Sequence, residues 1–164
     1  MHELFQWLEN SAYSQWAVGE SLLGWPTSLT VHAFGTAVVI GFIFIIDLRL
    51  IGFFRTIPYS ALINLFPYMW IAAVVQVLSG FTLWMTKPTK YVGDGAFLAK
   101  FSFVIIGLVV TWLFSRVIKR EAVKWEEAGT VSPLGHKYAA ATFVVWCAVL
   151  IAGRLTAYLG GLYA

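Results

Sequence analysis

The sequence predicts an all-α integral membrane protein: a four-helix bundle preceded by one or two short interfacial helices. Of its 164 residues, 60% are hydrophobic and only 12% are charged, about half the charge of an ordinary soluble domain. Four apolar stretches are each long enough, as helices, to cross a hydrocarbon core of ~30 Å. Helices are expected because the backbone in lipid must satisfy its own polar groups. Short connections favour an up-down-up-down order.

The first expected unit, residues 1–27, is aromatic and partly amphipathic, which is typical of helices lying in a membrane interface. Residues 28–164 form the bundle. The third span is expected to continue into water, because residues 116–128 mix charged side chains with helix formers. The four expected spans are Leu29–Ile51, Ala61–Met85, Phe97–Ile118 and Tyr138–Leu159.

Composition also excludes several classes of protein. High hydrophobicity argues against a soluble globule and against intrinsic disorder. The chain has no Lys- or Arg-rich run, so nucleic acid is not an expected partner. Its single cysteine, Cys147, rules out an intramolecular disulfide and a CxxC motif. P-loop, GxGxxG, HExxH and serine-elbow motifs are absent as well.

The placement of Lys and Arg near the span ends predicts the orientation. Seven lie on one side and two on the other, which places the loops after the first and third spans in the cytoplasm. We therefore expect a multi-pass protein of a bacterial inner membrane with both termini in the periplasm. Outer aromatic residues Trp84, Tyr91, Tyr158 and Tyr163 would form a belt at that interface. The seven are Arg49, Arg55, Arg116, Lys119, Arg120, Lys124 and Lys137; the two are Lys87 and Lys90.

Three ionisable residues inside the spans are the main functional candidates, because such groups are costly in a membrane. His32 lies about one turn inside the first span, Lys100 lies about one turn inside the third, and Arg154 lies roughly two turns before the end of the fourth. The alternating direction of the spans puts all three within ~10 Å of the outer boundary. The spans place no acidic side chain near them, so an anionic ligand would balance their charge.

Haem b would supply both a metal for the imidazole and anions for the two cationic side chains, because its iron binds imidazole and its propionates bind Arg or Lys. We expect His32 to be the axial ligand, and Lys100 to be a second ligand or, like Arg154, a propionate partner. Gly35 would leave room for the macrocycle beside its helix. Either of two further residues at this level, Trp84 and Met85, could pack on a porphyrin edge, and Met85 is in principle an axial ligand.

Simpler interpretations stand beside this one. His32 can bond a neighbouring helix and nothing else, and Lys100 and Arg154 can extend to the interface. His136 is ~25 Å from His32 along the bundle, so the two cannot share one haem, whereas His2 is terminal. Functionally, the alternatives are a structural, homo-oligomeric membrane protein or a carrier of a metal or small molecule. A redox role would involve a quinone or a soluble periplasmic partner.

Several polar residues elsewhere have expected structural roles. Gln76 should hydrogen-bond between helices near mid-membrane. Asp47 and Arg49 lie at the cytoplasmic end of the first span, where they could pair with Arg116 or cap a helix contact.

Three segments carry a family resemblance. Residues 31–52, VHAFGTAVVIGFIFIIDLRLIG, resemble the His-x-x-Gly…Asp-Leu-Arg-Leu-x-Gly signature of an uncharacterised bacterial family of four-helix membrane proteins. Residues 97–110 and 146–158 resemble the Lys-bearing and Gly-Arg-Leu-x-Ala-Tyr segments of that family. More distantly, the chain is similar to HemJ-like protoporphyrinogen oxidases and CopD-like membrane domains. The HemJ-like resemblance implies haem b, with His32 as its ligand and Lys100 as a functional lysine. The aromatic and Arg-rich helix motif of HemJ-like proteins is missing, so oxidase activity is not implied.

Overall fold

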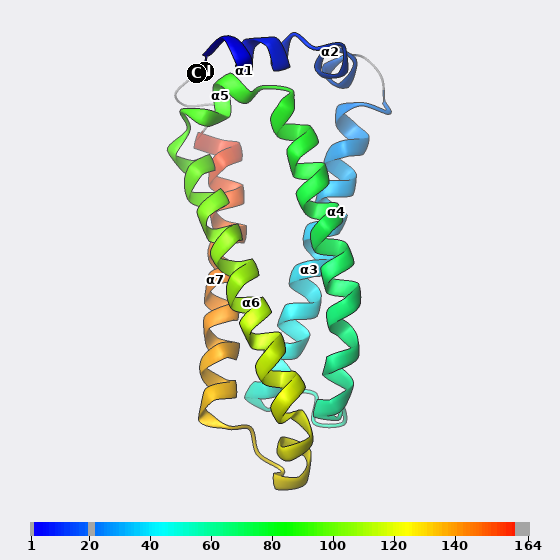
Figure 1. Ribbon diagram of the computed structural model, residues 1–164, viewed down its shortest axis with the longest axis vertical. Helices are drawn as coiled ribbons and strands as arrows, with labels where there is room; N and C mark the ends of the chain where they lie inside the picture. Colours follow the sequence, from blue (N-terminus) through cyan, green and yellow to red (C-terminus); the bar gives the residue numbers. More distant parts are fainter. Residues whose placement is uncertain (1, 20–21, 160–164) are drawn as a thin grey trace.

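Four long helices form the body of the protein, and two short ones lie across one end (Figure 1). The computed structural model describes the backbone of residues 2–19 and 22–159, and the side chains of residues 3–19 and 22–156. Within that part of the chain all regular structure is helical. The elements are α1 (His2–Glu9), α2 (Ala12–Val18), α3 (Trp25–Ile51), η1 (Tyr59–Leu65), α4 (Phe66–Met85), α5 (Pro88–Val92), α6 (Gly95–Ala128) and α7 (Pro133–Leu159).

The expected membrane protein of four spans is confirmed at the level of its helices. Four segments are long and apolar enough to cross a bilayer: Trp25–Ile51, Tyr59–Met85, Gly95–Ala128 and Pro133–Thr156. The first and fourth begin four to five residues earlier than expected. Pro26 and Pro133 each occupy the first turn of a helix, where the missing N–H of proline costs nothing.

The second span differs from expectation because it begins as a 3₁₀ helix, η1, before α4 continues it. Pro67 explains the change. It has no N–H to donate, and its ring would collide with the carbonyl four residues earlier in a regular α-helix.

The helix of the third span continues to Ala128, through the charged segment 116–128, as predicted. Asp94 caps its beginning, because one carboxylate oxygen accepts from the Ala96 N–H at 2.8 Å and the Phe97 N–H at 3.4 Å. Gly129 ends the helix with φ +66°, a left-handed conformation that glycine adopts without strain.

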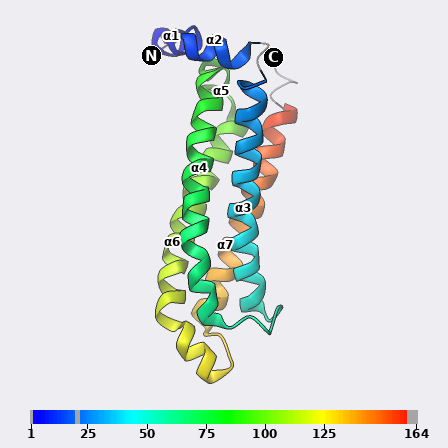
Figure 2. The same cartoon turned by 90° about the vertical axis from the view of Figure 1, so that its right-hand side faces the viewer.

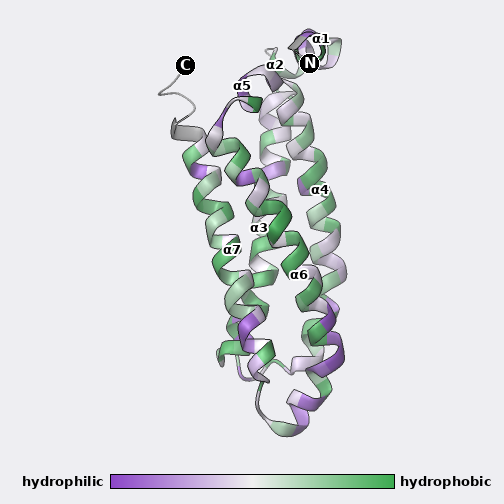
Figure 3. Cartoon of the chain, turned by 60° about the vertical axis from the view of Figure 1, so that its left-hand side comes forward, coloured by the Kyte–Doolittle hydropathy of each residue, from purple (hydrophilic) through white to green (hydrophobic). Residues whose placement is uncertain are grey.

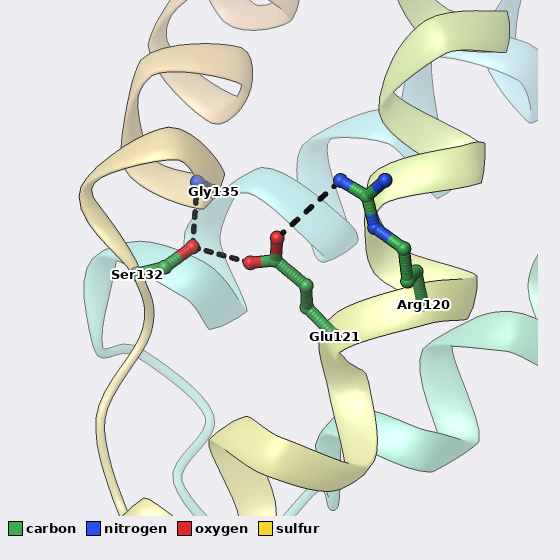
Figure 4. A network of polar contacts seen from close by, with 4 residues as sticks. All are labelled: Arg120, Glu121, Ser132 and Gly135. Atoms are coloured by element: carbon green, nitrogen blue, oxygen red, sulfur yellow. Dashed lines mark hydrogen bonds and ion pairs between the residues drawn. The ribbon is translucent and has the colours of Figure 1, made fainter.

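A polar network closes the turn between α6 and α7 (Figure 4). The Ser132 hydroxyl donates to Glu121 at 2.6 Å and accepts from the Gly135 N–H at 3.2 Å. Glu121 also lies 3.7 Å from the exposed guanidinium of Arg120, in the single ion pair among the described residues.

The long helices are arranged in two neighbouring pairs. Helix α3 packs along α4, and α6 packs along α7; α3 also contacts α7, while η1 packs against α6. Figure 2 shows the pairs from the side, with α1 and α2 crossing the end where α3 begins. These two short helices lie in the segment that was expected to be helical before the first span.

The hydrophobic core lies in the half of the bundle away from α1 and α2. Along α3 the buried apolar side chains start at Val39, and along α4 they stop at Ala73. The other half, here called the outer half, buries only Gly35, Ser79 and Ala152 from its span segments. Figure 3 shows hydrophobic colour along the long helices and the densest hydrophilic colour at the end of the bundle away from α1 and α2, where α6 protrudes. The outer half of the spans therefore lacks a packed apolar core.

Candidate functional site

The imidazole of His32 bridges two helices. It lies on α3, seven residues or about 10 Å from the helix start. Its Nδ1 is 3.1 Å from the Ser79 hydroxyl, and its Nε2 is 3.1 Å from the side-chain nitrogen of Gln76. Both partners belong to α4. The prediction that Gln76 bonds between helices is thus confirmed, and its partner proves to be His32.

The surrounding hydrogen bonds assign the imidazole proton. The Gln76 amide group donates to the Thr36 hydroxyl at 2.6 Å, and that hydroxyl donates to the His32 carbonyl at 2.8 Å. The Ser79 hydroxyl donates to the Val75 carbonyl at 2.8 Å, so it must accept from His32 Nδ1–H. Nε2 then accepts from the second hydrogen of the Gln76 amide. A neutral imidazole with its proton on Nδ1 satisfies every donor in this network.

Two glycines let α3 and α4 approach closely at this point. A Cβ atom on Gly80 would lie 3.0 Å from His32 Cε1, and one on Gly35 would lie 2.8 Å from Gln76 Oε1. Gly35 was expected to leave space for a macrocycle. In this structure the Gln76 side chain occupies the space beside Gly35.

One acceptor in the network is left over. Gln76 Oε1 is buried and has no hydrogen-bond partner among the described residues. A buried polar atom without a partner is costly.

Lys100 belongs to a helix that begins at the same end of the bundle as α3. It lies on α6, five residues or about 7.5 Å from the helix start. Its aliphatic carbons pass the face of Gly153 on α7, with Cε 3.7 Å from where a Cβ would be. Lys100 is half-buried, and none of the described acidic side chains forms an ion pair with it. His32 and Lys100 therefore lie at similar depths from the same end of the bundle, as expected from the sequence.

Arg154 occupies the expected depth but points elsewhere. It is exposed, whereas its neighbour Gly153 faces Lys100. Successive residues on a helix are rotated by 100°, so the two cannot share a direction. Arg154 forms no hydrogen bond or ion pair with the residues that the structure describes.

Trp84 and Met85 lie beneath the crossing helices rather than beside His32. The ring of Trp84 stacks on Phe81 at 5.7 Å and meets Phe5 of α1 edge-on at 6.1 Å. The backbone carbonyl of Met85 accepts from Ser14 of α2 at 2.9 Å. Both residues are more than a helical turn beyond Gly80, which touches His32.

The remaining histidines do not contribute to this site. His136 is exposed at the opposite end of the bundle, where its Nδ1 is 3.2 Å from the Ser132 carbonyl. The side chain of His2 lies outside the described residues, as do Tyr158 and Tyr163 of the expected aromatic belt.

Sequence analysis missed Thr36, Ser79 and Gly80 as partners of His32. A usable signal was present, since Gln76, Ser79 and Gly80 are spaced i, i+3, i+4 and therefore share one helix face. Of the two roles expected for Asp47, pairing with Arg116 is not observed, whereas a contact between helices is. Asp47 instead bonds to Thr142 of α7, and Arg116 stacks on the Trp112 ring at 3.8 Å.

The side chains at this site are of the types that haem sites use, an imidazole for iron and a cationic side chain for a propionate. His32 Nε2 is held only by a neutral, rotatable amide, and Lys100 carries a charge that no described acidic side chain neutralises by an ion pair. The described residues offer no ligand set for a bare metal ion, because their His, Cys, Asp and Glu side chains form no group of three or more.

Comparison with protein-family models, with curated proteins and with solved structures gave no match to this chain. The resemblances to the uncharacterised four-helix family and to HemJ-like and CopD-like proteins stay predictions.

Proposed function

We propose that this chain binds one haem b in the outer half of its bundle, with His32 as the axial ligand. The observation that carries the proposal is that a half-buried imidazole and a half-buried lysine, which has no acidic ion-pair partner among the described residues, lie at similar depths in the bundle. Both lie in the part of the bundle that lacks a packed apolar core.

Each residue has a distinct part in the proposal. Displacement of the Gln76 side chain would free His32 Nε2 for iron, while Ser79 would accept from Nδ1–H and orient the ring. Lys100 would be a second ligand or a propionate partner, and Arg154 would be a propionate partner. Met85 and Trp84 approach the group only if α1 and α2 shift. Haem would supply one-electron chemistry.

The corresponding role is electron transfer or redox sensing near the periplasmic face of a bacterial inner membrane. A quinone or a soluble periplasmic protein would be the electron partner, and copies of the chain would associate. The excess of Lys and Arg at the opposite end supports this orientation.

The absorption spectrum of protein purified from haem-replete cells tests the proposal. We expect a Soret band that shifts on reduction, and its loss in His32→Ala. His136→Ala is the matched control, because that histidine is exposed at the other end. If His32→Ala does not fold, Gln76→Leu serves instead and should retain or increase haem content. A wild-type protein without a Soret band, or a band unchanged in folded His32→Ala, overturns the proposal.

One observation favours a second candidate function, a structural module without a cofactor. Both ring nitrogens of His32 are already hydrogen-bonded to α4. In that case His32→Ala lowers the stability of the α3–α4 pair, and the purified wild-type protein shows no visible absorption.

A further inference from the structure

Asp47 is a second intramembrane ionisable group, far from the candidate haem site. It lies on α3 fifteen residues after His32, which corresponds to about 22 Å along the helix. Its exposed fraction is 0%. Such a residue inside a membrane span is costly unless its charge is paired or removed.

The positively charged groups nearest in sequence or space do not pair with Asp47. Arg49, two residues later on α3, donates to the Ile57 carbonyl and stacks on the Tyr59 ring of η1, 3.8 Å from its centroid. From α6, Arg116 is exposed and stacks on Trp112. At the start of α7, His136 and Lys137 are exposed.

The single polar contact of Asp47 is a hydroxyl. Oδ1 lies 2.8 Å from the Thr142 hydroxyl of α7, whereas Oδ2 is buried and has no partner among the described residues. That hydroxyl also lies 2.8 Å from the Tyr138 carbonyl one turn earlier. Thr142 has one hydrogen and cannot donate to both acceptors.

The two protonation states of Asp47 differ in what they leave unsatisfied. If Asp47 is ionised, Thr142 donates to it, the Tyr138 carbonyl loses that donor, and a charged oxygen stays buried without a partner. If Oδ1 carries a proton, Asp47 donates to the Thr142 hydroxyl, and that hydroxyl donates to the Tyr138 carbonyl. The only atom without a hydrogen-bond partner is then Asp47 Oδ2, which is a neutral carbonyl oxygen in this state. A neutral unpaired acceptor is much less costly than a charged one.

We propose that Asp47 is a proton-binding site in the inner half of the membrane, occupied while α3 and α7 are packed together. The bound proton completes the donor chain from Asp47 through Thr142 to the Tyr138 carbonyl. It ties α3 to α7 without any buried charge. Asp47 lies four residues, about 6 Å, from the end of α3, so the adjacent aqueous phase supplies and receives the proton.

Infrared spectroscopy of the haem-free protein tests this proposal independently of cofactor binding. A protonated carboxyl group has a carbonyl stretch that carboxylates lack and that shifts in D₂O. At neutral pH we expect this band in the wild type and its loss in Asp47→Asn. The matched control Glu127→Gln, on the exposed end of α6, should keep the band.

Thr142 variants keep the test informative if Asp47→Asn does not fold. Thr142→Val removes the acceptor of the proton, so the band should shift to higher frequency, whereas Thr142→Ser should leave it near the wild-type position. Absence of the band at neutral pH, its persistence in folded Asp47→Asn, or an identical band in Thr142→Val overturns the proposal.

Discussion

Gln76 on α4 donates to His32 Nε2 on α3 at 3.1 Å, and the same amide donates to Thr36 at 2.6 Å. The only intramembrane histidine among the described side chains is thus held by a neutral side chain from the neighbouring helix. His32 therefore connects α3 to α4 and is at the same time a candidate ligand.

The approach of α3 to α4 predicts opposite outcomes for two glycines on one helix. In Gly35→Ala the new methyl group would lie 2.8 Å from Gln76 Oε1 and would displace that side chain from His32, so this substitution should lower the stability of the protein. Around Gly41 a Cβ would meet nothing within 4 Å. Gly41→Ala should therefore be neutral or stabilising by up to about 1 kcal/mol. Unfolding in mixed micelles measures both, and equal effects of the two substitutions would contradict the packing described.

The bond between Thr36 and Gln76 should contribute measurably to the α3–α4 contact. Thr36→Val removes the hydroxyl with little change of shape and should cost about 0.6 kcal/mol, up to about 1.7, the range measured for bonds between membrane helices. Thr30 offers a matched control, because its hydroxyl bonds only to the Pro26 carbonyl of its own helix. A loss in Thr30→Val as large as that in Thr36→Val would refute an interhelical role.

Tyr91 on α5 predicts a dependence of stability on alkaline pH. Burial, and secondly the charge of Asp94, raises the pKa of its phenol above the ordinary value. The unfolded chain then loses this proton at lower pH than the folded protein. Stability from the neutral phenol is therefore fully present below about pH 10, the unfolded-chain value, and is lost as the pH rises through the folded-state pKa.

The absorbance of the phenolate as a function of pH measures this shift, with Tyr91→Phe identifying the contribution of Tyr91. In Asp94→Asn the pKa should fall only part of the way, because burial is the larger cause and remains. Asparagine also caps helices well, so α6 should keep its start. An Asp94→Asn titration curve that coincides with the wild-type curve would exclude a role for the carboxylate charge.

The orientation in the membrane is open to a labelling experiment. In a Cys147→Ser background, Lys90→Cys lies on α5 and Lys124→Cys lies on the far end of α6, and both positions are exposed. In intact cells an impermeant maleimide should label position 90 and leave position 124 unlabelled until the cells are lysed. The reverse pattern would place the candidate haem site on the cytoplasmic side.

The sequence by itself determined the four spans, the extension of α6 and the depth of His32 and Lys100. These features depend on local composition, on helix geometry and on the thickness of a bilayer, which are the same in any packing arrangement. Interfacial helices at the amino terminus followed from amphipathicity in the same way.

Only the tertiary structure decided which side chains meet. The rotation of each helix and the order of helices around the bundle depend on packing between spans, and an apolar stretch in lipid carries no strong periodic signal of its buried face. For that reason the position of Gln76 beside Gly35, the outward direction of Arg154 and the pairing of Asp47 with Thr142 could not be obtained from spacing along the chain. Depth in the membrane is encoded residue by residue, whereas facing direction is a property of the assembled bundle.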